Sequence, residues 1–205
     1  MAINKPSLGS SAFEKSLRSI KVDKSHEHAE VLLLTCIDFR FFTLIAEKMS
    51  RMGLAGKYDH FILAGAALGA TLDFSDAHLP EPKAPECQCK PLLPRLHWQQ
   101  VFLEHLQIAL KLHNTIKRVI IIEHRECGAY KTFLKPEGYP KPMPKRDPER
   151  DAHKAQSDKL ERIIKAHFPS LRVDKWLAQL KPAGVGPLRI LAPDAIDALE
   201  IESLG

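Results

Sequence analysis

The chain has 205 residues, of which 44% are apolar and 27% charged, and its formal net charge is +5. This length fits one domain with a single core, and the composition excludes disordered and fibrous proteins. Apolar runs such as residues 31–34 and 119–122 are far shorter than the ~20 residues that span a bilayer, so no membrane-spanning protein is expected. The densest basic cluster, residues 141–150, is interleaved with prolines and acidic residues, which favours a solvated loop over a nucleic-acid site.

Apolar runs alternate with amphipathic stretches, and this order predicts the fold class. In chain order the pattern predicts a helical arm at about 10–22, a strand at 29–38, a helix at 40–53, a strand at 60–66, a helix at 96–113, a strand at 118–124, a helix at 151–168 and a strand at 187–191. Strand–helix alternation implies right-handed crossovers. We therefore expect a single α/β domain over residues 1–205, with a central, mostly parallel sheet flanked by helices.

Two proline-rich stretches interrupt this alternation, at about residues 71–95 and 131–150. Both are predicted to be long loops, and loops of this length in a compact domain are often functional. We expect the first loop to cover the mouth of a binding site or a partner subunit. It also carries Cys87 and Cys89, for which two inconsequential thiols, a second metal site and a redox latch are all open interpretations.

The cysteine count and the amino terminus bear on the compartment. Four cysteines in 205 residues are too few for a disulfide scaffold. The first twenty residues lack the apolar core of a secretory signal. A cytoplasmic protein is the expectation.

Cysteine and histidine side chains stand where two predicted strands end. The first strand leads into Cys36, and the third leads into His124 and Cys127. Thiolates and imidazole are ligands that zinc prefers, and strand ends hold them rigidly. Three protein ligands leave one position of a tetrahedral ion open, as in catalytic zinc sites. The sequence therefore predicts a zinc site formed by Cys36, His124 and Cys127.

An acidic and a basic residue follow Cys36 at alternate positions, namely Asp38 and Arg40. In an extended segment these side chains would share the face of Cys36. A carboxylate there can accept a hydrogen bond from hydroxide on the zinc, and the arginine would keep it ionised and oriented. A structural ion pair is the alternative for this pair taken alone.

The two motifs C-x-D-x-R and H-x-x-C-G, in this order and about ninety residues apart, resemble those of the β-class carbonic anhydrases. The resemblance covers roughly residues 29–130. It implies an α/β fold around a parallel sheet, zinc held by Cys36, His124 and Cys127, and a catalytic Asp38–Arg40 dyad. It also implies a homodimer or larger homo-oligomer with the site near the subunit interface, and reversible hydration of carbon dioxide to bicarbonate. Small residues predicted to let the backbone approach the substrate are Ala64, Gly65, Ala66 and Gly128.

The chain departs from the family pattern at two places near these motifs. Glu123 precedes the zinc histidine where the family usually has glycine, which puts a carboxylate beside the site. Residues 63–66 read Leu-Ala-Gly-Ala where the family reads close to Arg-Asn-Ala-Gly, so the pocket is expected to be less polar. Two alternative functions therefore stay open. One is hydrolysis of carbonyl sulfide or carbon disulfide, and the other is a non-catalytic, zinc-binding regulatory role.

Overall fold

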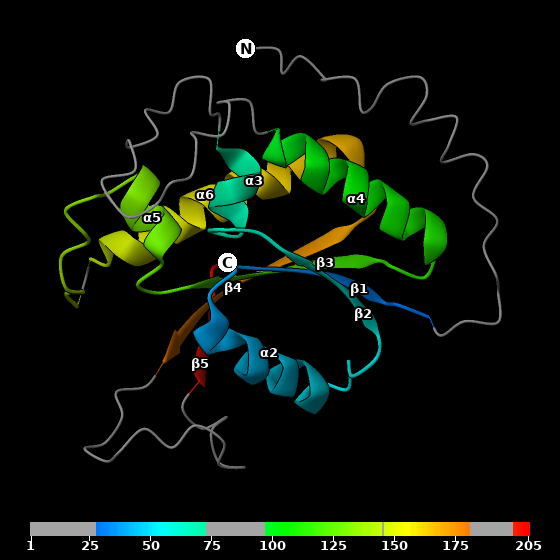
Figure 1. Cartoon of the computed structure of the whole chain (residues 1–205), viewed down its shortest axis with the longest axis horizontal. Coiled ribbons are helices and arrows are strands. Elements are labelled where there is room, and N and C mark those ends of the chain that lie inside the picture. Colours follow the sequence, from blue (N-terminus) through cyan, green and yellow to red (C-terminus); the bar gives the residue numbers. More distant parts are fainter. Residues whose placement is uncertain (1–27, 73–96, 145, 181–198) are drawn as a thin grey trace, which may run out of the picture.

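The computed structural model describes residues 28–72, 97–144, 146–180 and 199–205 (Figure 1). Five strands form one sheet in the order β2-β1-β3-β4-β5. The strands are β1 (Val31–Thr35), β2 (Tyr58–Ile62), β3 (Arg118–His124), β4 (Arg172–Leu180) and β5 (Leu199–Ser203). The first four strands are parallel, and β5 runs antiparallel to β4. The expected α/β architecture with a mostly parallel sheet is confirmed.

Helices cover both faces of this sheet, as Figure 1 shows. One face carries α2 (Phe39–Arg51). The other carries α3 (Ala67–Thr71), α4 (Trp98–Leu112) and α6 (Pro148–His167), with the short α5 (Gly128–Phe133) at its end. Within the described ranges, no helix is long and apolar enough to cross a membrane.

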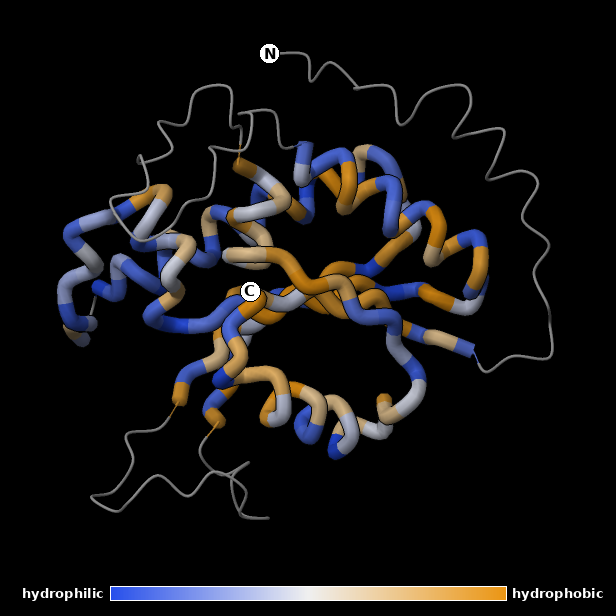
Figure 2. The backbone as a smooth tube through the Cα atoms, in the orientation of Figure 1, coloured by the Kyte–Doolittle hydropathy of each residue, from blue (hydrophilic) through white to orange (hydrophobic). Residues whose placement is uncertain are grey.

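The central strands form where the apolar runs are, because both of their faces are buried. Every residue of β1 is buried, and so is every residue of β3 after the first. Figure 2 shows the apolar colour concentrated along these strands in the middle of the molecule. Leu32 and Leu34 pack toward α4 and α6, whereas Leu33 packs toward α2. Alternation along a strand thus supplies two cores, one on each face.

Local signals set both ends of α2 and the start of α6. The side chain of Asp38 accepts the backbone N–H of Arg40 and begins α2. Gly53, at a φ of 74°, follows the end of the same helix in the left-handed region that favours glycine. Asp147 caps α6 by accepting the N–H of Arg150, and Pro148 follows at a position where a missing N–H costs nothing.

Several sequence-based boundaries need correction. The stretch 131–150 is not one continuous loop, because α5 extends to Phe133 and α6 begins at Pro148. The helix α3 was not predicted, since its five residues are too few to show a helical period. Strands β4 and β5 were not predicted either. The strand β4 contains Lys175, which reads as a surface residue but is buried and paired with Asp158 and Glu161 of α6, at 2.6 and 2.7 Å.

Other expectations lie outside the described residues. They are the helical arm at about 10–22, the loop at 71–95 beyond residue 72, with Cys87 and Cys89, and the strand at 187–191. These remain predictions.

The order of the strands determines where a site can form. The connection from β1 to β2 runs through α2 on one face, whereas the connection from β2 to β3 runs through α3 and α4 on the other (Figure 1). The carboxyl ends of β1 and β3 therefore lie side by side at the point where the connections switch from one face of the sheet to the other. Ligands of open α/β sheets bind at such points.

Candidate metal centre

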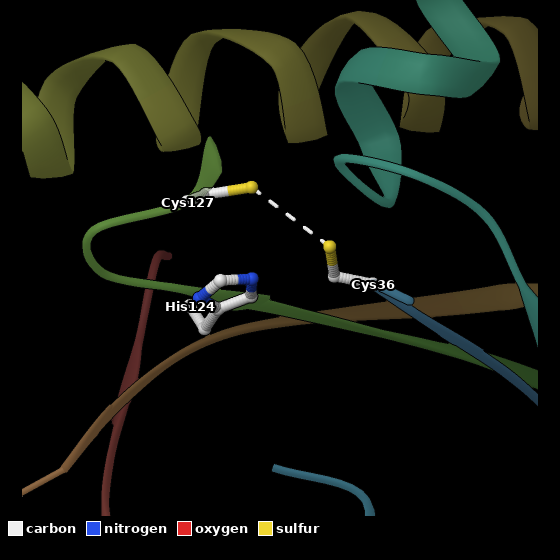
Figure 3. A group of neighbouring side chains, drawn as sticks. All are labelled: Cys36, His124 and Cys127. Carbon is white, nitrogen blue, oxygen red and sulfur yellow. Dashed lines mark hydrogen bonds between the residues drawn. The ribbon is translucent and has the colours of Figure 1, made fainter. Parts of the chain in front are cut away.

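Three side chains meet at the carboxyl ends of β1 and β3 (Figure 3). Cys36 follows the last residue of β1, His124 is the last residue of β3, and Cys127 lies three residues further on, just before α5. Their ligand atoms all lie within 4.8 Å of one another, and the two Sγ atoms are 3.8 Å apart. The prediction that these residues come together is confirmed. The group could hold a metal ion.

The orientation of the His124 ring leaves one nitrogen available as a ligand. Its Nδ1 donates a hydrogen bond to the carbonyl oxygen of Arg125 over 2.9 Å. The other nitrogen, Nε2, is buried and has no hydrogen-bond partner among the described residues. A buried polar atom without a partner is costly. A metal ion bound at Nε2 satisfies that atom, and the bond at Nδ1 fixes the ring as is usual for metal-binding histidines.

The two cysteine sulfurs lie within hydrogen-bonding distance of each other, 3.8 Å apart. A hydrogen bond from Cys127 holds the pKa of Cys36 below the usual thiol value, although burial opposes this. The same contact raises the pKa of Cys127, and burial adds to the effect. The backbone N–H of Gly65 also donates to Cys36 Sγ, over 3.3 Å. The contact between the two sulfurs thus moves their pKa values in opposite directions.

A carboxylate and a guanidinium lie beside these ligands. Arg40 Nη2 donates to Asp38 Oδ2 over 2.7 Å, and Arg40 Nε donates to Oδ1 over 3.0 Å. Hydrogen bonds from Arg40 hold the pKa of Asp38 below its usual value. Asp38 Oδ2 lies 3.8 Å from His124 Nε2, the nitrogen available for a metal. The Asp38–Arg40 pair thus lies beside the candidate metal centre, and its catalytic role remains a prediction.

The backbone that presents this pair differs from the expectation. Asp38 and Arg40 do not alternate along an extended segment, because Asp38 caps α2 and Arg40 lies in its first turn. The two side chains meet because the capping carboxylate also accepts the backbone N–H of Arg40, over 3.0 Å.

An aromatic side chain supports the site and was not singled out from the sequence. The centroid of the Phe41 ring lies 4.5 Å from that of the His124 ring. The guanidinium carbon of Arg40 lies over the Phe41 ring, 5.7 Å from its centroid. Phe41 is 3% exposed and belongs to the core under α2. Only the meeting of α2 with β3 brings this core residue against His124.

The segment between His124 and Cys127 is held by ionic contacts. Arg125 donates to both oxygens of Asp147, over 2.6 and 3.1 Å, and to Glu202 over 3.1 Å. Glu126 adopts a φ of 58°, which few residues other than glycine adopt, and its N–H donates to Glu149 over 2.6 Å. These contacts fix the turn that brings Cys127 back toward His124.

The carboxyl group of Glu123, which was expected beside the site, is directed toward α3 and α6. Its side chain is fully buried, and Oε1 accepts the N–H of Ala67 over 2.8 Å. Its Oε2 lies 3.1 Å from His153 Nδ1 on α6. Successive strand residues point to opposite faces, so Glu123 faces the helices α3 and α6 whereas His124 lies against Phe41 of α2.

The residues predicted to approach a substrate have different surroundings. Gly65 contacts the metal centre through its amide and is buried, as is Ala66. Ala64 is partly exposed, and Gly128 is exposed at the start of α5, next to Cys127. Their role toward a substrate remains a prediction.

Comparisons with known proteins identify relatives in one bacterial genus. An uncharacterized protein of Rickettsia conorii is 30% identical over 167 residues, which cover 78% of this chain and 76% of the relative. An uncharacterized protein of Rickettsia bellii is 29% identical over 171 residues, which cover 82% of this chain and 89% of the relative. No family model matches the sequence. The chain belongs to the same family as the Rickettsia conorii protein.

Removal of one thiolate should abolish tight metal binding. We expect the Cys36→Ser protein, prepared with zinc, to retain well under one equivalent by elemental analysis, because a hydroxyl is a poor substitute for a thiolate ligand. His97→Gln is the control, since His97 is an exposed residue at the start of α4. Undiminished zinc in Cys36→Ser protein would reject the ligand assignment.

Metal binding should also tighten as the pH rises. Burial lowers the pKa of His124, but the neighbouring Cys36 more than offsets this and raises it, and the pKa of Cys127 is raised too. A metal ion must displace these protons, so protons compete with it more strongly at low pH. Calorimetric titration with zinc at pH 6, 7 and 8, in two buffers of different ionisation enthalpy, should show proton release and rising affinity. An affinity independent of pH contradicts this.

Proposed function

We propose that the chain is a zinc-dependent enzyme that catalyses the reversible hydration of carbon dioxide to bicarbonate. The observation that carries the proposal is the position of Asp38. Two hydrogen bonds from Arg40 fix the orientation of its carboxylate, and its Oδ2 lies 3.8 Å from Nε2 of His124. A metal that only stabilises the fold has no use for an oriented carboxylate at its edge. A catalytic metal does.

The donor set supports zinc as the metal. Two sulfurs and an imidazole nitrogen suit this borderline-soft ion, and three protein ligands leave a fourth position for water. Bound there, zinc lowers the pKa of water and so supplies a nucleophile at mild pH. Cys36, His124 and Cys127 would hold the ion. The charges of two thiolates offset that of the ion, so we expect activity to be favoured at alkaline pH.

The chain's own groups then orient the reaction. Asp38, ionised because Arg40 hydrogen-bonds to it, can accept a hydrogen bond from the attacking water and so direct a lone pair toward the substrate carbon. Arg40 also holds Asp38 in its capping position, and it would thereby keep the carboxylate from occupying the position left for water. The Phe41 ring limits the movement of the His124 ring that it contacts.

A second candidate reaction is hydrolysis of a sulfur analogue such as carbonyl sulfide or carbon disulfide. The observation that favours it is the turn at residues 63–67, which has only apolar or no side chains and whose Gly65 amide contacts Cys36. An apolar surrounding suits the larger, more polarisable sulfur atom of these substrates.

A stopped-flow assay with carbon dioxide and carbonyl sulfide side by side, at a pH near 8.5, separates these reactions. We expect zinc-dependent hydration of carbon dioxide. Faster turnover of carbonyl sulfide would favour the hydrolase, and stoichiometric zinc without turnover of either gas would favour a regulatory, non-catalytic role.

Loss of the guanidinium should separate metal binding from turnover. We expect Arg40→Ala protein to keep its zinc but to lose about 100-fold or more in kcat, since positioned proton-transfer groups contribute 10²–10⁴-fold. The matched control is Arg51→Ala, which removes the arginine at the other end of the same helix. Full activity of Arg40→Ala protein would remove the Asp38–Arg40 pair from the mechanism.

An exposed apolar surface beside the Asp38–Arg40 pair supports assembly into a homodimer. Phe39 is 87% exposed and Ile37 64%, and they lie on either side of Asp38 in the sequence. Phe42, on the next turn of α2, stacks on His60 of the edge strand β2, and Ile62 of that strand is exposed as well. Contiguous exposed apolar side chains mark interaction sites. A second copy of this chain is the occupant that we propose, with the site near the interface.

A charge in this surface should disrupt the assembly. We expect Phe39→Glu protein to be a monomer in sedimentation-velocity experiments at concentrations where the wild-type protein is a dimer, because an unpaired buried charge is strongly unfavourable in an interface. Val101→Glu is the control, since Val101 is 53% exposed on α4, away from this surface. Identical sedimentation of Phe39→Glu and wild-type protein would exclude this surface as the interface.

A further inference from the structure

A carboxyl group outside the proposed mechanism links the sheet to the turn beside the metal centre. Glu123 is fully buried, which is rare for a glutamate, and both of its oxygens have partners. Oε1 accepts the N–H of Ala67, the first residue of α3, over 2.8 Å. Ala66, at the capping position of α3, has no side-chain oxygen to accept this N–H. Glu123 therefore supplies from β3 the cap that α3 lacks in its own sequence.

The turn that Glu123 caps has an unfavourable backbone. Gly65 and Ala66 adopt φ values of 74° and 45°, both in the left-handed region, and Ala66 is not a glycine. Such a conformation persists only where the surrounding structure holds it. The N–H of Ala66 donates to Leu63 and that of Leu68 to Gly65, over 2.8 and 2.9 Å, but both bonds are internal to the turn. The bond from Ala67 to Glu123 ties the turn to β3.

The same turn delivers a hydrogen bond to a metal ligand. The N–H of Gly65 donates to Cys36 Sγ over 3.3 Å. A β-carbon at position 65 would lie 3.0 Å from Ala129 Cβ, so only glycine fits this close approach as well as the φ. Gly65 is two residues before the amide that Glu123 holds.

From this chain of contacts we infer that Glu123 is a positioning residue, which fixes the turn at residues 63–67 so that the Gly65 amide hydrogen-bonds to the metal-ligating sulfur of Cys36. The inference rests on the proposed function in that it assumes that Cys36 binds the metal. A hydrogen bond to a thiolate withdraws negative charge from the sulfur and fixes its direction toward the ion. Loss of a group that hydrogen-bonds to a metal ligand typically lowers metal affinity by about 10- to 100-fold.

Replacement of the capping carboxyl tests the inference by a readout other than activity. The probe is ¹⁵N-labelled protein loaded with ¹¹³Cd, a soft ion that thiolates bind. In wild-type protein we expect the Gly65 amide proton to show scalar coupling to ¹¹³Cd through the N–H···S hydrogen bond. In Glu123→Leu protein we expect that coupling to be lost and the affinity for zinc to fall roughly 10- to 100-fold.

Two matched variants separate positioning from general disturbance of the core. Glu123→Gln keeps a carbonyl oxygen for Ala67, so we expect it to retain the coupling. His153→Leu removes the other partner of Glu123 in the same buried region, and it too should retain the coupling. If Glu123→Leu protein does not fold, Glu123→Asp replaces it, because its side chain is one methylene shorter and should lose the bond to Ala67.

The outcomes distinguish this inference from the proposed function. Unchanged Gly65 coupling in the Leu or Asp variant, or equal loss in His153→Leu protein, overturns the positioning role and leaves the metal centre intact. Wild-type protein that binds neither cadmium nor zinc contradicts the metal centre instead. The chemical shift of the Gly65 amide proton in metal-free protein then decides the positioning role, since its bond to Cys36 is present without metal.

Discussion

The parallel pairing of β1 with β3 is the constraint on which the rest of the molecule depends. Its register sets Thr35 opposite Ile122, so that Cys36 follows one residue after this pair and His124 two residues after it. A shift of one residue would turn His124 to the other face of the sheet. The two buried, β-branched and leucine-rich strands resist such a shift because each face packs against its own core. The candidate metal ligands therefore owe their geometry to the hydrophobic core.

One carboxylate joins the folding of α2 to the chemistry proposed for the site. Asp38 begins the helix by accepting the N–H of Arg40, and the same group forms an ion pair with the Arg40 side chain. It also lies 3.8 Å from the free nitrogen of His124. A cap, an ion pair and a position beside the metal centre are thus properties of a single side chain. Any change that frays the first turn of α2 should also misplace the carboxylate.

The two sides of the metal centre are supported from opposite faces of the sheet. His124 lies against Phe41 on the α2 face, whereas Glu123, its neighbour in sequence, is bonded to α3 and α6. Farther along, Arg125 is held by Asp147 at the start of α6. Three consecutive residues therefore tie the end of β3 to helices from distant parts of the chain. This arrangement surrounds the candidate ligands with fixed side chains from both faces of the sheet.

Much of the fold and of the candidate site could be predicted from local patterns in the sequence, and the remainder could not. The sequence by itself determined the approximate positions of β1, β3 and α2, because apolar runs and helical spacing need no distant partner to be recognised. It also predicted that Cys36, His124 and Cys127 meet, but their geometry is set by the pairing of β1 with β3. It did not determine β4, where Lys175 is buried by pairing with Asp158 and Glu161. Nor did it determine where the Glu123 side chain points, because its hydrogen-bond partner Ala67 is 56 residues away in the sequence. A charged residue can be buried only when a distant group compensates it, and which groups meet is decided by the tertiary structure.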